Sequence, residues 1–392
     1  MCLEILSKFI SFSSFMTPIN IFILLIGISQ AVGLGQDHTA NRSTETYAAI
    51  ELSAEGAKVA ALQFSKNEEE PGVKLIYSDH VKFSLARSLE GEFPPKASIE
   101  GAIAVQKLLQ RLRMEFNVPD EHIYLLGTSE LSADHPQDLL STINKATGKN
   151  LTFLDAATEV QLSIVGTIPQ RERSGSSYID NRNTSVLIDL GSYSISGGYQ
   201  LLKYSPSPQY DFTTMTIPHG ALSVSNELSR TGGLNGGWMT LLQEAKALCS
   251  GPFRDALRKE RDGKPGLFNR KRVYLTGSTA WALATLLYPD KRDNYIQLKS
   301  EDIETFSEKV ARSPWNLLNP SLSFMRDREL RREAESEIKA VRETFTPQQL
   351  VAASELLKTM SDELNWREKK VYFARMGNFS SLLSYLRLVV GK

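Results

Sequence analysis

The sequence has little of the residue chemistry on which disulfide-rich and metal-rich proteins depend. Its 392 residues include two cysteines, Cys2 and Cys249, too few for a disulfide framework or for a zinc site built on cysteine. The five histidines show no HxxxH or HxH spacing, which argues against histidine-based metal chemistry. The 45 basic residues are balanced by 45 acidic ones, so the chain lacks the basic excess of an electrostatically driven nucleic-acid binder.

The N-terminal apolar block, residues 21–28, is shorter than the roughly 20 residues of a membrane span and fits the core of a signal peptide. Ser29 and Ala31 place small residues where a signal peptidase requires them. We therefore interpret residues 1–35 as a signal peptide or short membrane anchor. We expect an extracytoplasmic protein, periplasmic or secreted, that meets a membrane only through this segment. An uncleaved anchor and a buried helix of the fold remain as alternatives.

The length predicts two globular domains. Short apolar runs on either side of residues 54–56 predict a β-hairpin, and helical spacing of apolar residues predicts a helix over 98–116. A second hairpin is predicted over 185–204. The polar, turn-forming stretch 169–184 is predicted to be an exposed loop. Residues 301–392 are predicted to be helical, and Thr346, followed by proline and two glutamines, is typical of a helix start.

Three turns that follow predicted strands carry the functional signal: residues 51–56, 189–194 and 276–279. Small residues in such turns let backbone N–H groups point at an anion, and two turns facing each other can hold a phosphate. A carboxylate at the strand end, Glu51 or Asp189, can hold Mg²⁺ against phosphate oxygens. Each turn alone is a common structural feature, and the three in this order are more specific.

The order of these segments resembles the exopolyphosphatase/guanosine pentaphosphate phosphatase (Ppx/GppA) family of the actin-like ATPase superfamily. Residues 51–56 are similar to the family's Asp-Ile-Gly-Ser-Asn-Ser turn, and 127–132 to its Ala-Thr-Ser-Ala-Leu-Arg block. Residues 155–162 are similar to Ser-Gly-Glu-Glu-Glu-Ala-Arg-Leu, 189–196 to Asp-Ile-Gly-Gly-Gly-Ser-Thr-Glu, and 275–280 to the Gly-Gly-Thr-Ala turn. The resemblance covers most of the chain from Tyr47 onward.

The resemblance implies an α/β fold of two ribonuclease-H-like domains, 47–165 and 166–300, with a cleft between them and a C-terminal helical segment, 301–392, on the core. It implies hydrolysis of a terminal phosphoanhydride with Mg²⁺ and an attacking water, with inorganic polyphosphate as the expected substrate. Glu159 falls on the family's general base, and Glu51 and Asp189 on the metal site. A homodimer is possible in this fold. The implied phosphate-binding residues are Ser53, Ala54, Thr128, Ser129, Gly191, Ser192, Ser194, Gly277, Ser278 and Thr279.

The sequence also departs from the family pattern. Glu55 stands where a neutral asparagine is expected, Ser132 where an arginine is expected, and Tyr193 where a glycine is expected. A carboxylate beside a phosphate site repels the substrate unless a cation compensates. Two interpretations follow. The chain is a divergent phosphoanhydride hydrolase, or it is a catalytically degenerate member that binds an anionic ligand or a partner protein.

Overall fold

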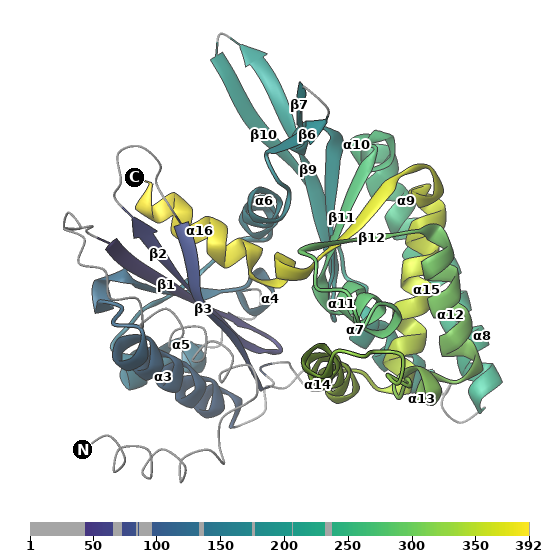
Figure 1. Ribbon diagram of the computed structural model, residues 1–392, viewed down its shortest axis with the longest axis horizontal. Helices are drawn as coiled ribbons and strands as arrows, with labels where there is room; N and C mark the ends of the chain where they lie inside the picture. The colour runs from purple at the N-terminus through teal and green to yellow at the C-terminus, as the bar shows by residue number, and fades with distance from the viewer. Residues whose placement is uncertain are drawn as a thin grey trace.

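The computed structural model describes residues 44–65, 73–83, 85, 96–132, 137–174, 177–205, 207–231 and 237–391. The predicted signal peptide or anchor lies outside these residues. None of the helices described is long and apolar enough to span a bilayer. Figure 1 shows two units, each built around its own β-sheet.

The first unit is a five-stranded sheet in the order β3-β2-β1-β4-β5. Strands β1, β2 and β3 pair antiparallel, and β4 and β5 add in parallel to β1. One face packs on α3 and α5, and the other carries α16 from the C-terminus of the chain (Figure 1). The elements are β1 (Thr44–Ser53), β2 (Gly56–Ser65), β3 (Val73–Lys82), α3 (Ala97–Glu115), β4 (Ile123–Gly127), α4 (Ser129–Ser132), α5 (Gln137–Thr147), β5 (Leu151–Phe153), α6 (Ala156–Thr167) and α16 (Ser380–Val390).

The second unit is a six-stranded sheet in the order β10-β9-β8-β11-β13-β12. Its central strands β8, β11 and β13 run parallel, so their carboxyl ends lie at one edge of the sheet. The strands are β8 (Ser185–Leu190), β9 (Ile195–Ser205), β10 (Ser207–Ile217), β11 (Arg272–Thr276), β12 (Tyr295–Leu298) and β13 (Lys370–Ala374). The helices are α7 (Ala221–Arg230), α8 (Trp238–Leu248), α9 (Arg254–Gly263), α10 (Gly266–Asn269), α11 (Gly277–Leu287), α12 (Ser300–Arg312), α13 (Pro314–Leu317), α14 (Arg328–Thr344) and α15 (Pro347–Glu363).

Local sequence accounts for the elements that were predicted. The first hairpin turns at residues 54–55, and the helix predicted over 98–116 is α3. The start of α15 is a reciprocal capping box, in which Gln349 N donates to Thr346 Oγ1 at 3.2 Å and Thr346 N donates to Gln349 Oε1 at 2.7 Å. These signals come from neighbouring residues, so they can be read without knowing the tertiary structure.

Two predictions about secondary structure are wrong. The stretch 169–184 is not simply a loop, because β6 (Arg171–Ser174) and β7 (Ser177–Asp180) pair antiparallel within it. Residues 301–392 are not entirely helical, because β13 lies between β11 and β12 in the second sheet. Polar strands and a five-residue strand among helices carry too weak a periodic pattern, and pairing with partner strands decides their structure.

The two units are joined at more than one point in the chain. After α6, the chain enters the second sheet, and after β13 it returns through Arg375–Phe379 into α16. Leu382 and Leu386 of α16 pack with Ala49, Ala60 and Leu126 of the first sheet. The C-terminal helix therefore closes the first unit, and it also places polar side chains beside the strand ends of that unit.

Candidate functional site

Four of the segments singled out in the sequence meet where the two units face each other. Ser194 Oγ, from the turn between β8 and β9, donates to Glu130 Oε1 of α4 at 3.0 Å. Ser192 Oγ lies 3.2 Å from Ser278 Oγ, which joins the second and third turns. Tyr193 lies within electrostatic reach of Glu55 and Glu130 in the first unit, and burial raises the pKa of its phenol to about 12. The predicted turns therefore converge on one interface.

Glu159 is fixed at this interface by local helix chemistry. Asp155 caps α6 by accepting from Thr158 N at 2.9 Å, which places Glu159 in the first turn of the helix. Ser129 Oγ donates to Glu159 Oε2 at 2.5 Å. Burial raises the pKa of Glu159 to about 8, and the nearby charge of Glu51 contributes to the same shift. A carboxyl group with a pKa in this range is suited to accept a proton near neutral pH.

Glu51 is held by protein groups on both carboxylate oxygens. Glu51 is 4% exposed and lies near the end of β1. Lys58 Nζ, from the facing position of β2, is 3.6 Å from Oε1, and Ser381 Oγ of α16 donates to Oε2 at 2.8 Å. Both oxygens of Glu51 therefore have protein partners, and its role as a metal ligand stays a prediction.

Asp189 differs from Glu51 because one of its oxygens has no partner. Its Oδ1 is buried without a hydrogen bond, at the end of β8. Burial raises the pKa of Asp189, against the opposing effect of Lys58. Gly277 lies against this oxygen with a φ of +87°, and a Cβ built there would be 2.3 Å from Oδ1. A side chain at position 277 would therefore collide with the carboxylate, so glycine is required here, and Asn378 Oδ1 accepts from Gly277 N at 3.2 Å.

The described residues of this site offer Mg²⁺ few direct protein ligands. Among the residues described, no group of three or more histidine, cysteine or acidic side chains could hold a metal ion. Mg²⁺ often binds through one or two carboxylates, with waters and substrate phosphates completing its octahedral shell. The unpaired oxygen of Asp189 fits that role, whereas the oxygens of Glu51 already have protein partners.

Lys58 is the residue that the sequence analysis missed. Burial lowers the pKa of its ammonium group, but the carboxylates of Glu51, Asp189, Glu55 and Glu159 raise it, and the net shift is upward. The register of the predicted hairpin was the available signal, because a turn at 54–55 pairs residue 58 with residue 51. Ser381 and Asn378 had no comparable signal, since they reach the site only through the C-terminal return of the chain.

The remaining predicted phosphate-binding residues lie at the same strand ends with varied exposure. Thr128 N donates to Leu52 O at 2.9 Å, and Thr128 Oγ1 is buried without a partner. Ser53 Oγ accepts from Glu55 N at 3.3 Å within the first turn. The side chains of Ala54 and Thr279 are buried, so they can contribute through the backbone only. A Cβ at Gly191 would lie 2.8 Å from Ser194 O, which explains a small residue in that turn.

Comparison with known proteins supports the fold. No family model matches the chain, and no curated protein sequence matches it. A solved Ppx/GppA family member from Aquifex aeolicus is 12% identical with a TM-score of 0.56, over 89% of this chain and all of that one (100%). An exopolyphosphatase-like protein is 13% identical with a TM-score of 0.58, over 88% and 99% of the two chains. An exopolyphosphatase from Cytophaga hutchinsonii is 12% identical with a TM-score of 0.52, over 88% and 98%.

These likenesses extend over nearly the whole length of both chains, although sequence identity is low. The α/β fold with two sheet-based units that the resemblance implied is therefore confirmed, and the chain shares the fold of the solved Ppx/GppA proteins.

Proposed function

We propose that the chain is a divergent Ppx/GppA-type phosphatase that hydrolyses a terminal phosphoanhydride, with inorganic polyphosphate as substrate. The observation that carries this proposal is the position of Glu159, which lies among the converging turns with a pKa near 8 and a fixed contact to Ser129. An exported enzyme would meet polyphosphate more readily than cytoplasmic nucleotides, so an extracytoplasmic location belongs to the same proposal.

In the proposed reaction, a water oxygen attacks the terminal phosphorus atom and Glu159 takes the proton that this water loses. The bond from phosphorus to the bridging oxygen breaks, and its electron pair leaves with the shortened polyphosphate. The products are inorganic phosphate and a chain one unit shorter. Ser129 orients the carboxylate for this proton transfer through its 2.5 Å hydrogen bond.

Charge neutralisation would come from two sources. Lys58 supplies an ammonium group whose pKa is raised by four neighbouring carboxylates. Mg²⁺, held by Asp189 Oδ1 and by substrate oxygens, would supply the remaining positive charge and polarise the terminal phosphate. The backbone of the turns around Gly191 and Gly277 would donate hydrogen bonds to phosphate oxygens.

The test is phosphate release from long-chain polyphosphate by the full chain with Mg²⁺, beside Glu159→Gln. We expect the variant to lose at least about a hundredfold in kcat, because the general base is removed. Glu335→Gln is the matched control, since Glu335 is exposed on α14, far along the chain from the turns. Equal rates for Glu159→Gln and the wild type would contradict the proposal.

A second function has one specific observation in its favour. Tyr193 is half-buried in the turn between β8 and β9, within electrostatic reach of Glu55 and Glu130, so a phenol and two carboxyl groups lie near the turns that would bind phosphate. This arrangement favours a protein that binds an anionic ligand or a partner without hydrolysing it. Folded wild-type protein that binds polyphosphate and releases no phosphate would establish the second function and refute the first.

A further inference from the structure

The loop that follows β13 lies at the same edge of the second sheet as the turns that follow β8 and β11. These three strands run parallel, so their carboxyl ends share one edge. Ligands of open α/β sheets bind in the crevice outside the carboxyl ends of the strands. The turns after β8 and β11 belong to the candidate site. Residues 375–379, which follow β13, are therefore the third segment from which a ligand contact is expected.

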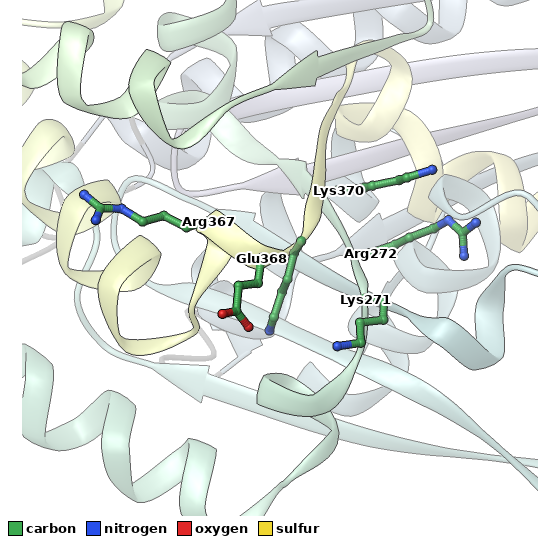
Figure 2. Close-up of a pocket in the computed structure, with 6 residues that line it drawn as sticks. Lys271, Arg272, Arg367, Glu368 and Lys370 are labelled. Atoms are coloured by element: carbon green, nitrogen blue, oxygen red, sulfur yellow. The ribbon is translucent and has the colours of Figure 1, made fainter.

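The opposite ends of the same strands do not bring polar groups together in this way. Lys271, Arg272 and Lys370 lie there, beside a cavity of about 420 Å³. Lys271 points away from Arg272 and Lys370 (Figure 2). Arg272 Nη1 already donates to Thr184 Oγ1 at 3.1 Å. The search for a further ligand contact therefore leads to the carboxyl ends.

The loop after β13 packs directly on the turn that follows β11. A Cβ built at Gly377 would lie 2.1 Å from Thr276 Cγ2, so glycine permits this close approach. Ser380 Oγ donates to Gly377 O at 2.7 Å, which closes the loop on itself. Arg375 Nη1 donates to Glu337 Oε1 at 2.7 Å and holds the start of the loop. These contacts fix the loop before any ligand binds.

Asn378 lies in this fixed loop with one end of its amide group bound and the other end free. Its Oδ1 accepts from Gly277 N at 3.2 Å. Because a backbone N–H is the donor, the amide oxygen must face Gly277, and the amide nitrogen takes the other position. No described residue accepts a hydrogen bond from Asn378 Nδ2, and this atom is not buried. Both N–H groups of the amide are therefore free to donate to a ligand.

Asn378 also lies between contacts that join the two units. Gly277, its hydrogen-bond partner, lies against Asp189, the carboxylate with an unpaired oxygen. Three residues after Asn378, Ser381 Oγ donates to Glu51 Oε2 at 2.8 Å in the first unit. The free amide nitrogen is therefore carried by the short stretch of chain that touches the strand ends of both sheets.

The Gly277 N–H, which the resemblance assigns to phosphate, is already taken by Asn378. We propose that Asn378 binds a phosphoryl oxygen of the substrate through Nδ2 and so replaces this N–H as a phosphate donor. The inference rests on the proposed function, because it takes a phosphoanhydride as the ligand. A hydrogen bond from a neutral amide to an ionised phosphate is charge-assisted, so its loss should weaken binding measurably.

The test compares two variants of Asn378 that separate its donor from its acceptor. Asn378→Asp keeps an oxygen for Gly277 N and loses both N–H donors, whereas Asn378→Ala loses donors and acceptor without adding charge. Binding of tripolyphosphate is measured by calorimetry in the full chain carrying Glu159→Gln, so that turnover does not interfere. We expect the dissociation constant to rise at least about tenfold in both variants.

Asn294→Asp is the matched control for added charge. Asn294 is exposed, and its backbone oxygen accepts from Arg375 N at 2.9 Å, so the new charge lies beside the same loop. We expect its affinity for tripolyphosphate to stay within about twofold of the parent. A loss confined to Asn378→Asp would show charge repulsion alone, and a loss confined to Asn378→Ala would show that Asn378 only holds Gly277. Either result would overturn the proposal.

Hydrolysis of polyphosphate, measured with Glu159 intact, separates this inference from the proposed function. We expect KM to rise in both Asn378 variants while kcat changes less than about threefold, because the lost contact holds the substrate and takes no part in proton transfer. Hydrolysis with unchanged KM would refute the role of Asn378 and leave the proposed function standing. Weakened binding, in a protein whose wild type hydrolyses nothing, would support Asn378 and refute the proposed function. Absence of binding by the parent would overturn both. If Asn378→Ala does not fold, Asn378→Asp beside Asn294→Asp still decides.

Discussion

Glu159→Gln should make the protein more stable at alkaline pH. Burial raises the pKa of Glu159 from 4.5 to about 8 in the folded chain. The folded state therefore holds this proton more tightly than the unfolded state, and stability is lost as the pH rises from about 4.5 to about 8. Glutamine has no charge to bury, so the variant does not lose this stability and still accepts the hydrogen bond from Ser129.

The size of the effect follows from the shift in pKa. Each pKa unit corresponds to about 1.4 kcal/mol, so the shift sets an upper limit of about 5 kcal/mol. Water reaching the partly exposed carboxylate reduces this value, and we expect about 2 kcal/mol above pH 8. At pH 5, wild type and variant should differ by less than about 1 kcal/mol, because that pH is only half a unit above the unfolded pKa of 4.5 and Glu159 is still largely protonated in the folded state.

The assay is thermal unfolding of wild type, Glu159→Gln and Glu335→Gln between pH 5 and pH 9. The Tm of Glu159→Gln should exceed that of the wild type by about 3 °C at pH 8.5 and by only about 1 °C at pH 5. The exposed control should follow the wild type throughout. A Tm difference that does not change with pH, or a less stable Glu159→Gln at pH 8.5, would refute the argument that ionisation of the buried Glu159 carboxyl group lowers the stability of the fold.

Three further predictions concern the groups around Glu159. Lys58→Met should lower the free energy of unfolding by about 2 kcal/mol in urea, because it leaves the Glu51 carboxylate buried without its cation; an unchanged midpoint would contradict the ion pair. Gly277→Ala should cost about 2–3 kcal/mol, because a Cβ collides with Asp189 Oδ1 at a positive φ, whereas Gly263→Ala, with open space around it, should not. Chelation by EDTA should stop phosphate release and Mg²⁺ should restore it, but not in Asp189→Asn; release that persists in EDTA would exclude the proposed metal.

Some of the contacts behind these predictions can be predicted from the sequence, and others cannot. The position of the hairpin turn sets the register of β1 and β2, and this register predicts that Glu51 pairs with Lys58. Ser381 and Glu51 are 330 positions apart in the sequence, and no local pattern near either residue predicts their hydrogen bond. The contact exists because α16 returns from the second sheet to pack on the first.

The sequence by itself determined the local elements and the order of the turns. The glycine at position 56, the amphipathic spacing of α3 and the capping box at Thr346 act between residues a few positions apart, so their effects do not depend on the rest of the chain. Resemblance in the order of short motifs was enough to predict the fold that the solved structures share.

Only the tertiary structure decided which polar groups share an environment. It buried Glu159 beside Ser129, gave both oxygens of Glu51 protein partners, and left one oxygen of Asp189 unpaired. It also placed β13 beside β11 and so brought Asn378 to the Gly277 N–H. Charge and hydration depend on distances between side chains in space, and strands far apart in the sequence set those distances when they pair.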